Sequence, residues 1–167
     1  MENVAHLLTA MKVELERHEY SLDLDALSDI CSQQHVRGHL AILTRPYLEK
    51  IVKKQKTIES RFSKFRTPPF SKVQIGDVVF LKEVAGPIHA IAFTSQVHSF
   101  GPMNIGEAEQ VMIEYQEGLQ LESDFKSRKQ NSLYATLISL ETVLPIKPLH
   151  LEKRDRRSWV VLTGKTT

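Results

Sequence analysis

The two segments on either side of Gly86 restrict the fold of this chain more than any other part of its sequence. Residues 73–83 contain a Gly-Asp turn followed by an apolar run, and residues 86–100 begin with a Gly-Pro turn and continue as a longer β-like segment. Two such segments joined by a short turn are typical of a β-hairpin. The hairpin predicts that at least part of the sheet is antiparallel.

Further strand-like segments lie near both ends of the chain. They occupy residues 39–44, 56–61, 132–145 and 158–162, and each has the apolar run or the alternation expected of a strand. Helical spacing separates them at residues 45–55 and 106–129, where the pattern breaks near Gly118. Strands from both ends, interrupted by helices, favour an α+β fold with a small mixed β-barrel, closed or nearly closed and flanked by helices, over a parallel sheet.

The first 36 residues predict a helical extension of this fold. Apolar residues recur at helical spacing from Val4 to Leu15. A second helix is expected from about Asp23, which together with Ser21 can cap its start. We therefore expect an extension over residues 1–36 and a main domain over residues 37–163. The apolar stripes of the two helices are suited either to covering the sheet or to binding a protein partner.

The composition is that of a folded protein in a reducing compartment. With 167 residues, of which 41% are hydrophobic and 25% charged, the chain can bury a core. A single cysteine, Cys31, excludes an internal disulfide framework, and the scattered histidines lack metal-site spacing. We expect Cys31 to be buried as a small apolar residue. Without a signal-peptide pattern or a membrane-spanning stretch, we expect a cytoplasmic protein with no cofactor, metal or membrane partner.

A dense group of charges at residues 53–62, KKQKTIESRF, is the clearest candidate for a binding site. Side chains two residues apart share one face of a strand, so Glu59 and Arg61 should project together, with Lys56 at the helix-to-strand junction. An ammonium and a guanidinium group favour phosphate or a polar base edge, and a carboxylate accepts from exocyclic amines. From spacing alone, an exposed ion pair without a function explains the same residues.

The segment KQKTIESR resembles the signature of the ASCH family of PUA-like β-barrel proteins, which is Gly-x-Lys-x-x-Glu-x-Arg. Lys56, Glu59 and Arg61 match its charged positions, and Lys54 stands in place of the glycine. The segments HLAILTRPYLEKI, VQIGDVVFLK and DRRSWVVL resemble other parts of the family, so that the resemblance spans about residues 37–163. It implies a PUA-like barrel whose charged cleft binds RNA or a modified nucleoside.

The same resemblance raises hydrolysis as an alternative function. One branch of small ASCH proteins, which this chain resembles in part, consists of amidohydrolases that remove the acetyl group from 4-acetylcytidine. Their proposed site contains a lysine, a threonine and a glutamate. Lys56 and Glu117 would match the lysine and the glutamate, whereas Glu59 replaces the threonine and would act as general base. Two flanking carboxylates should keep Lys56 protonated. Other members resemble ribonucleases, in which Lys56 and Arg61 would stabilise charge on phosphate. A solvated helix glutamate is the alternative explanation of Glu117.

Basic residues next to aromatic rings suggest further ligand contacts in two places, since such pairs can hold a phosphate while the ring stacks on a base. The residues concerned are Lys64 and Arg66, next to Phe62 and Phe65, and Arg156 and Arg157, next to Trp159. Solvated loop charges and a core tryptophan explain the same pattern, so both interpretations stay open.

Overall fold

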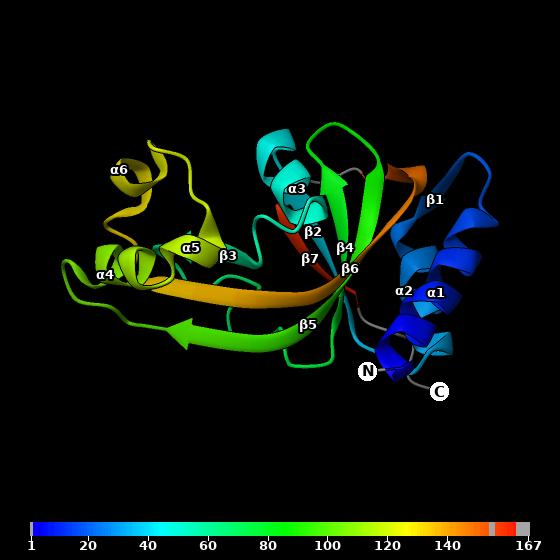
Figure 1. Cartoon of the computed structure of the whole chain (residues 1–167), viewed down its shortest axis with the longest axis horizontal. Coiled ribbons are helices and arrows are strands. Elements are labelled where there is room, and N and C mark those ends of the chain that lie inside the picture. The colour runs from blue at the N-terminus through cyan, green and yellow to red at the C-terminus, as the bar shows by residue number, and fades with distance from the viewer. Residues whose placement is uncertain (1, 154–155, 163–167) are drawn as a thin grey trace.

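The computed structural model describes residues 2–153 and 156–162 of the chain, and over these residues it has the mixed α+β fold that the sequence predicts (Figure 1). The helices are α1 (Glu2–Glu16), α2 (Leu24–Gln33), α3 (Arg45–Val52), α4 (Glu107–Glu114), α5 (Gln116–Leu119) and α6 (Phe125–Lys129). The strands are β1 (Ser21–Asp23), β2 (Gly38–Leu43), β3 (Ile58–Ser63), β4 (Val78–Glu83), β5 (Ile88–Phe100), β6 (Tyr134–Glu152) and β7 (Trp159–Leu162).

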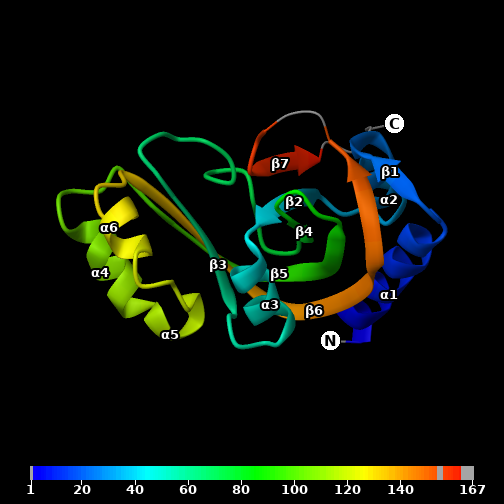
Figure 2. The same ribbon diagram turned by 90° about the horizontal axis from the view of Figure 1, so that it is seen from above.

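The described strands form one mixed sheet in the order β1-β6-β5-β4-β2-β7, and β3 also pairs with β6. The predicted hairpin is present as the antiparallel pair β4 and β5, whereas β2 runs parallel to β4. The sheet curves strongly (Figure 2). No hydrogen-bonded pairing among the described strands closes it, because β1 and β7 remain at opposite ends of the order. The mixed sheet is therefore confirmed, and a barrel closed by hydrogen bonds is not found.

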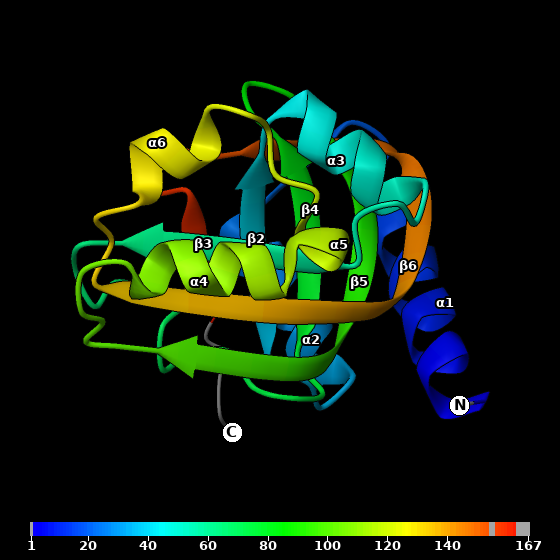
Figure 3. The same cartoon turned by 60° about the vertical axis from the view of Figure 1, so that its left-hand side comes forward.

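Two long strands, β5 and β6, join two parts of the molecule. Residues 88–93 of β5 pair with residues 142–149 of β6 and, together with β4, β2 and β7, belong to what we call the main sheet. Beyond the register shifts on either side of Thr94, the two strands continue as a ribbon. Residues 96–100 of β5, residues 134–139 of β6 and the whole of β3 form a three-stranded layer, which α4, α5 and α6 cover (Figure 3). We call this layer with its three helices the arm.

The strand β6 extends beyond the predicted segment 132–145: it continues through Pro145 and Pro148 to Glu152. Proline lacks the N–H group that a regular ladder requires. The pairing with β5 accommodates this by a register shift between Ile88 and Ala90, whose partners are Leu149 and Pro145. The bulge places the prolines where regular pairing is already interrupted.

The two N-terminal helices pack on the main sheet, where they share one hydrophobic core with its strands. Leu8, Met11 and Leu15 of α1 and Leu27, Ile30 and Cys31 of α2 are buried in this core with Leu40 and Phe80 of the sheet. Of the two expected uses of the apolar stripes, covering the sheet is the one that these contacts show. The boundary between residues 36 and 37 stays a prediction.

Asp23 caps α2 as expected, since its Oδ1 accepts from the backbone N–H of Ala26 at 2.8 Å. Ser21 does not share this role, because it lies in the unpredicted strand β1, whose pairing with β6 is parallel. Cys31 is fully buried, as predicted. No helix in the described part of the chain is long and apolar enough to cross a membrane.

Candidate nucleotide-binding site

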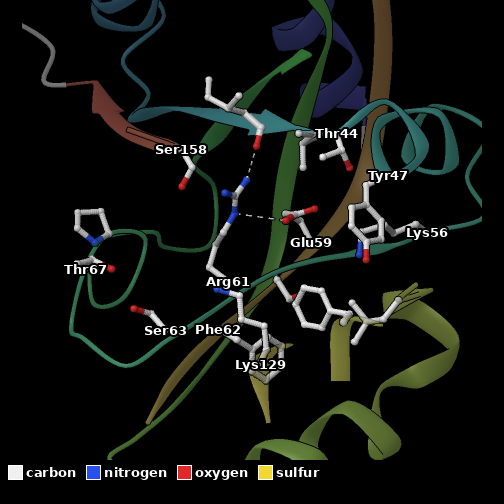
Figure 4. A pocket seen from close by; sticks show the side chains of 16 residues that line it. Thr44, Tyr47, Lys56, Glu59, Arg61, Phe62, Ser63, Thr67, Lys129 and Ser158 are labelled. Atoms are coloured by element: carbon white, nitrogen blue, oxygen red, sulfur yellow. Dashed lines mark hydrogen bonds and ion pairs between the residues drawn. The ribbon is translucent and has the colours of Figure 1, made fainter. Parts of the chain in front are cut away.

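A pocket of about 300 Å³ lies where the main sheet, α3 and the arm meet (Figure 4). The strand β3 runs along it, α3 forms one wall, and the segment that contains α6 forms the opposite wall. We call it the β3 pocket. Its polar side chains are those of Thr44, Tyr47, Lys56, Glu59, Ser60, Arg61, Ser63, Thr67, Lys129 and Ser158.

The alternation of β3 brings Glu59 and Arg61 to the pocket together, as the sequence predicts. Arg61 Nε lies 3.4 Å from Glu59 Oε1. The guanidinium group also reaches across the pocket to β2, where Nη2 donates to the backbone oxygen of Ile42 at 2.9 Å. Both side chains are mostly buried, with exposed fractions of 7% for Glu59 and 20% for Arg61. The pair is therefore not the solvent-exposed ion pair that spacing alone allowed.

Two buried atoms of this pair have no hydrogen-bond partner in the described chain, namely Glu59 Oε2 and Arg61 Nε. The Nε–Oε1 distance permits electrostatic attraction, but the geometry does not form a hydrogen bond. Buried polar atoms are costly when unpaired. The pair thus leaves one acceptor and one donor without a hydrogen-bond partner in the wall of the pocket.

Lys56 lies at the start of β3 and is only 2% exposed. Its Nζ donates to the backbone oxygen of Leu119 and lies 5.0 Å from the centre of the Tyr47 ring. Burial lowers the pKa of Lys56, and the nearby Glu59 carboxylate opposes this only in part. Of the two carboxylates that were expected beside Lys56, only that of Glu59 acts on it, and burial outweighs it, so the pKa of Lys56 lies below the ordinary lysine value.

Glu117 does not join this cluster. Its side chain is exposed on α5 and lines a separate hollow with Gln116, Gln120 and Lys50. The α5 segment contributes backbone instead: the Leu119 oxygen accepts from Lys56, and the Gly118 oxygen accepts from the Thr57 N–H at 3.0 Å. The expected trio of Lys56, Glu59 and Glu117 is thus not brought together, since the carboxylate of Glu117 points away from the pocket that its backbone helps to build.

The predicted basic residues near aromatic rings lie outside the β3 pocket. Lys64 and Arg66 are exposed in the loop after β3, where the Arg66 guanidinium carbon lies 5.4 Å from the Phe70 ring centre. Arg156 and Arg157 are exposed just before β7. Residues 154 and 155, which precede them, lie outside the described residues.

Trp159 is a core residue that nevertheless supports the pocket. It is 4% exposed, and the Arg61 guanidinium carbon lies 5.4 Å from its ring centre. Its indole N–H donates to His39 Nδ1 at 3.2 Å, and His39 Nε2 lies 2.7 Å from Asp77 Oδ2. Because Nδ1 accepts from the indole, Nε2–H is the donor to Asp77, and both ring nitrogens are engaged. The ring therefore cannot offer a free base to the pocket.

Sequence reasoning did not identify Tyr47 or the His39–Asp77 pair. The hydroxyl of Tyr47 accepts from the backbone N–H of Glu122 at 3.0 Å, which ties α3 to the arm, and burial raises the pKa of Tyr47. Helical periodicity marked Tyr47 only as part of the apolar face of its helix. For His39 and Asp77 the sequence carries no signal, because their contact depends on the parallel pairing of β2 with β4.

The described residues contain no group of three or more His, Cys, Asp or Glu side chains placed to hold a metal ion. The chemistry available in the β3 pocket is therefore that of one carboxylate, one guanidinium, one amine with a lowered pKa, and hydroxyl groups.

Comparison with known proteins gives matches among solved structures. No model of a protein family matches the chain, and no curated protein sequence matches it. The crystal structure of ASCH from Zymomonas mobilis superposes with a TM-score of 0.60, at 15% identity, over 75% of this chain and 87% of that one. A tyrosine-to-phenylalanine mutant of the same protein also superposes with a TM-score of 0.60, at 15% identity, over 75% of this chain and 89% of that one. This chain has the ASCH fold.

The ASCH fold confirms the resemblance that the segment KQKTIESR predicted, and it accounts for the mixed sheet and its flanking helices. At 15% identity the likeness concerns the fold alone. Ligand and activity must therefore be argued from the residues of the β3 pocket.

Proposed function

We propose that this protein binds a nucleoside in the β3 pocket, either within RNA or as a free modified nucleoside. The observation that carries the proposal is the buried Glu59–Arg61 pair with its two unpartnered atoms. A base edge that presents an amino group next to an acceptor atom suits this pair, because the carboxylate accepts from the amine and the guanidinium donates to the acceptor.

The rest of the pocket suits a base and its sugar. Tyr47, Phe62 and Phe125 line it, and aromatic rings of this kind stack on unpaired bases. Thr44, Thr67 and Ser158 add hydroxyl groups for the sugar or the base edge. The ASCH fold supports this proposal as an analogy, since the family resemblance implies an RNA-related ligand.

The test is a titration of the purified protein with each common ribonucleoside and with 4-acetylcytidine, followed by NMR chemical shifts. Glu59→Gln keeps the shape of the side chain but removes its charge, so we expect affinity to fall about tenfold or more. Glu117→Gln is the matched control, because it removes the same charge from an exposed position outside the pocket. Absence of binding by the wild type, or equal losses in the two variants, would contradict the proposal.

A second candidate is hydrolysis of 4-acetylcytidine, and the burial of Lys56 next to the Glu59 carboxylate favours it. Glu59 would take a proton from water as the water oxygen adds to the acetyl carbon. It would return that proton to the cytidine nitrogen as the carbon–nitrogen bond breaks, which releases acetate and cytidine. Lys56 would stabilise the developing oxyanion. Chromatography of the products tests this candidate. Turnover by the wild type that is lost in Lys56→Met supports hydrolysis. If the substrate stays intact, binding without hydrolysis is the function that remains.

Cleavage of RNA at its phosphodiester bonds is the remaining enzymatic alternative, in which Lys56 and Arg61 would stabilise charge on phosphate. The same chromatography, applied to a mixed single-stranded RNA, separates it from binding, because only cleavage shortens the strand. Regulation through a protein partner at the N-terminal helices would have to use their outer faces, since the apolar stripes lie against the sheet.

A further inference from the structure

We propose that a second nucleotide subsite adjoins the β3 pocket and takes the phosphate and the base of the next nucleotide of a single-stranded RNA. It is formed by Ser63, Lys64 and Phe65, which follow Arg61 along the chain, and by Arg128, Lys129 and Asn131 at the end of α6. This inference rests on the proposed function, because it requires the first nucleotide to occupy the β3 pocket.

The two hollows are adjacent. The second has a volume of about 300 Å³, and Ser63 and Lys129 line both of them. The strand β3 leads from one to the other: with a rise of about 3.3 Å per residue, Ser63 lies roughly 7 Å beyond Arg61. A strand of RNA whose base is held at Glu59 and Arg61 can therefore continue past Ser63 without leaving the surface.

The charges of the second hollow suit a phosphate group. Lys64, Arg128 and Lys129 line it, and none of the described residues that line it carries a carboxylate. Arg128 also pairs with Asp124 at 3.0 Å, but that pair is exposed, with 52% and 64% of its side chains accessible, so solvent screens it. Asn131 and Ser63 add hydrogen-bonding groups beside the cations.

Phe65 supplies the second element of the subsite. Its side chain is 71% exposed, and among the described residues no other phenylalanine is exposed to this degree. The Ser63 hydroxyl accepts from the Phe65 N–H at 3.0 Å, which fixes the loop that carries the ring. An exposed ring beside cations is the combination on which unpaired bases stack while their phosphates are neutralised. The cations argue for a nucleic acid over an apolar protein surface as the partner of this ring.

The experiment measures binding of a fluorescein-labelled single-stranded RNA of about eight nucleotides by anisotropy at several salt concentrations. Lys64→Gln should lower the slope of log affinity against log salt by about 0.7, because one phosphate contact is lost. Phe65→Ala should weaken binding about fivefold or more, because one stacking contact is lost. Lys147→Gln is the matched control, since it removes an exposed lysine from the opposite end of the molecule, next to α1.

Binding of free nucleosides, measured in parallel by NMR for each variant, reports on the β3 pocket alone. Loss of RNA affinity in Lys64→Gln and Phe65→Ala, beyond any loss for nucleosides, supports the second subsite. If RNA binding depends on Glu59 but these two variants match Lys147→Gln, the second subsite is wrong and the proposed function stands. If the wild type binds neither nucleosides nor RNA, both proposals fail.

Discussion

At the scale of single residues, the pocket depends on a side chain that never touches its opening. Trp159 lies under the Arg61 guanidinium, His39 accepts its indole N–H, and Asp77 accepts from His39. Asp77 Oδ2 also accepts from the backbone N–H of Gln74 at 2.9 Å. The direction of every donor in this series is fixed, so the series holds Trp159 in one orientation and thereby gives Arg61 a rigid floor.

Burial of Cys31 makes stability depend on pH in the alkaline range. Burial raises the pKa of its thiol from 9.0 to about 12. The unfolded chain releases the thiol proton first, so the unfolded state binds fewer protons above pH 9.0, and stability falls as pH rises from there towards 12. The slope approaches about 1.4 kcal/mol per pH unit.

We expect Cys31→Ala to be less stable than the wild type at neutral pH, because it leaves a small cavity, yet to lack this alkaline loss. Urea denaturation at neutral pH and at several values above pH 9.0 provides the check, with the difference between the two proteins isolating the thiol from other titrating groups. Parallel pH profiles for the two proteins would contradict the burial of the thiol.

At the scale of elements, the contact between α2 and β2 leaves no room for a side chain at residue 38. A Cβ added to Gly38 would lie 2.3 Å from Cys31 Sγ, which is closer than van der Waals contact allows. We expect Gly38→Ala to destabilise the protein by about 1–3 kcal/mol, because the helix must move away from the strand.

A double-mutant cycle identifies the cause of that loss. In a Cys31→Ala background the sulfur is absent, so the additional cost of Gly38→Ala should fall by at least half of its value in the wild type. Urea denaturation of the four proteins gives the coupling free energy. Strictly additive costs would show that the strain at residue 38 comes from elsewhere, such as Leu162, whose Cδ1 would lie 3.2 Å from the added Cβ.

At the scale of the whole molecule, the N-terminal helices complete the core on one side of the main sheet. Leu8, Met11 and Leu15 are at most 1% exposed, and they belong to one core with residues of six strands and of α2. We therefore expect a chain that lacks residues 1–35 to unfold or aggregate, because the deletion exposes a large apolar face. Circular dichroism and size-exclusion chromatography check this; a folded, monomeric product would make the helices an independent docking element.

The sequence predicted those features whose signals are local. The β4–β5 hairpin, the Asp23 cap and the shared face of Glu59 and Arg61 each depend on residues close together in the chain. Features set by distant pairing were missed: β1 is only three residues long and exists through its pairing with β6, and the sheet remains open. Glu117 was misplaced because helical spacing does not show which face of a short helix meets the strand.

The ribbon formed by β5 and β6 has a mechanical consequence for the β3 pocket. One wall, with Tyr47, belongs to a helix on the main sheet, and the other, with Phe125 and Lys129, belongs to the arm. The ribbon joins these two bodies, and its pairing is irregular at Thr94. A change in the twist of this ribbon would therefore change the separation of the two walls, and a ligand in contact with both walls would oppose that change.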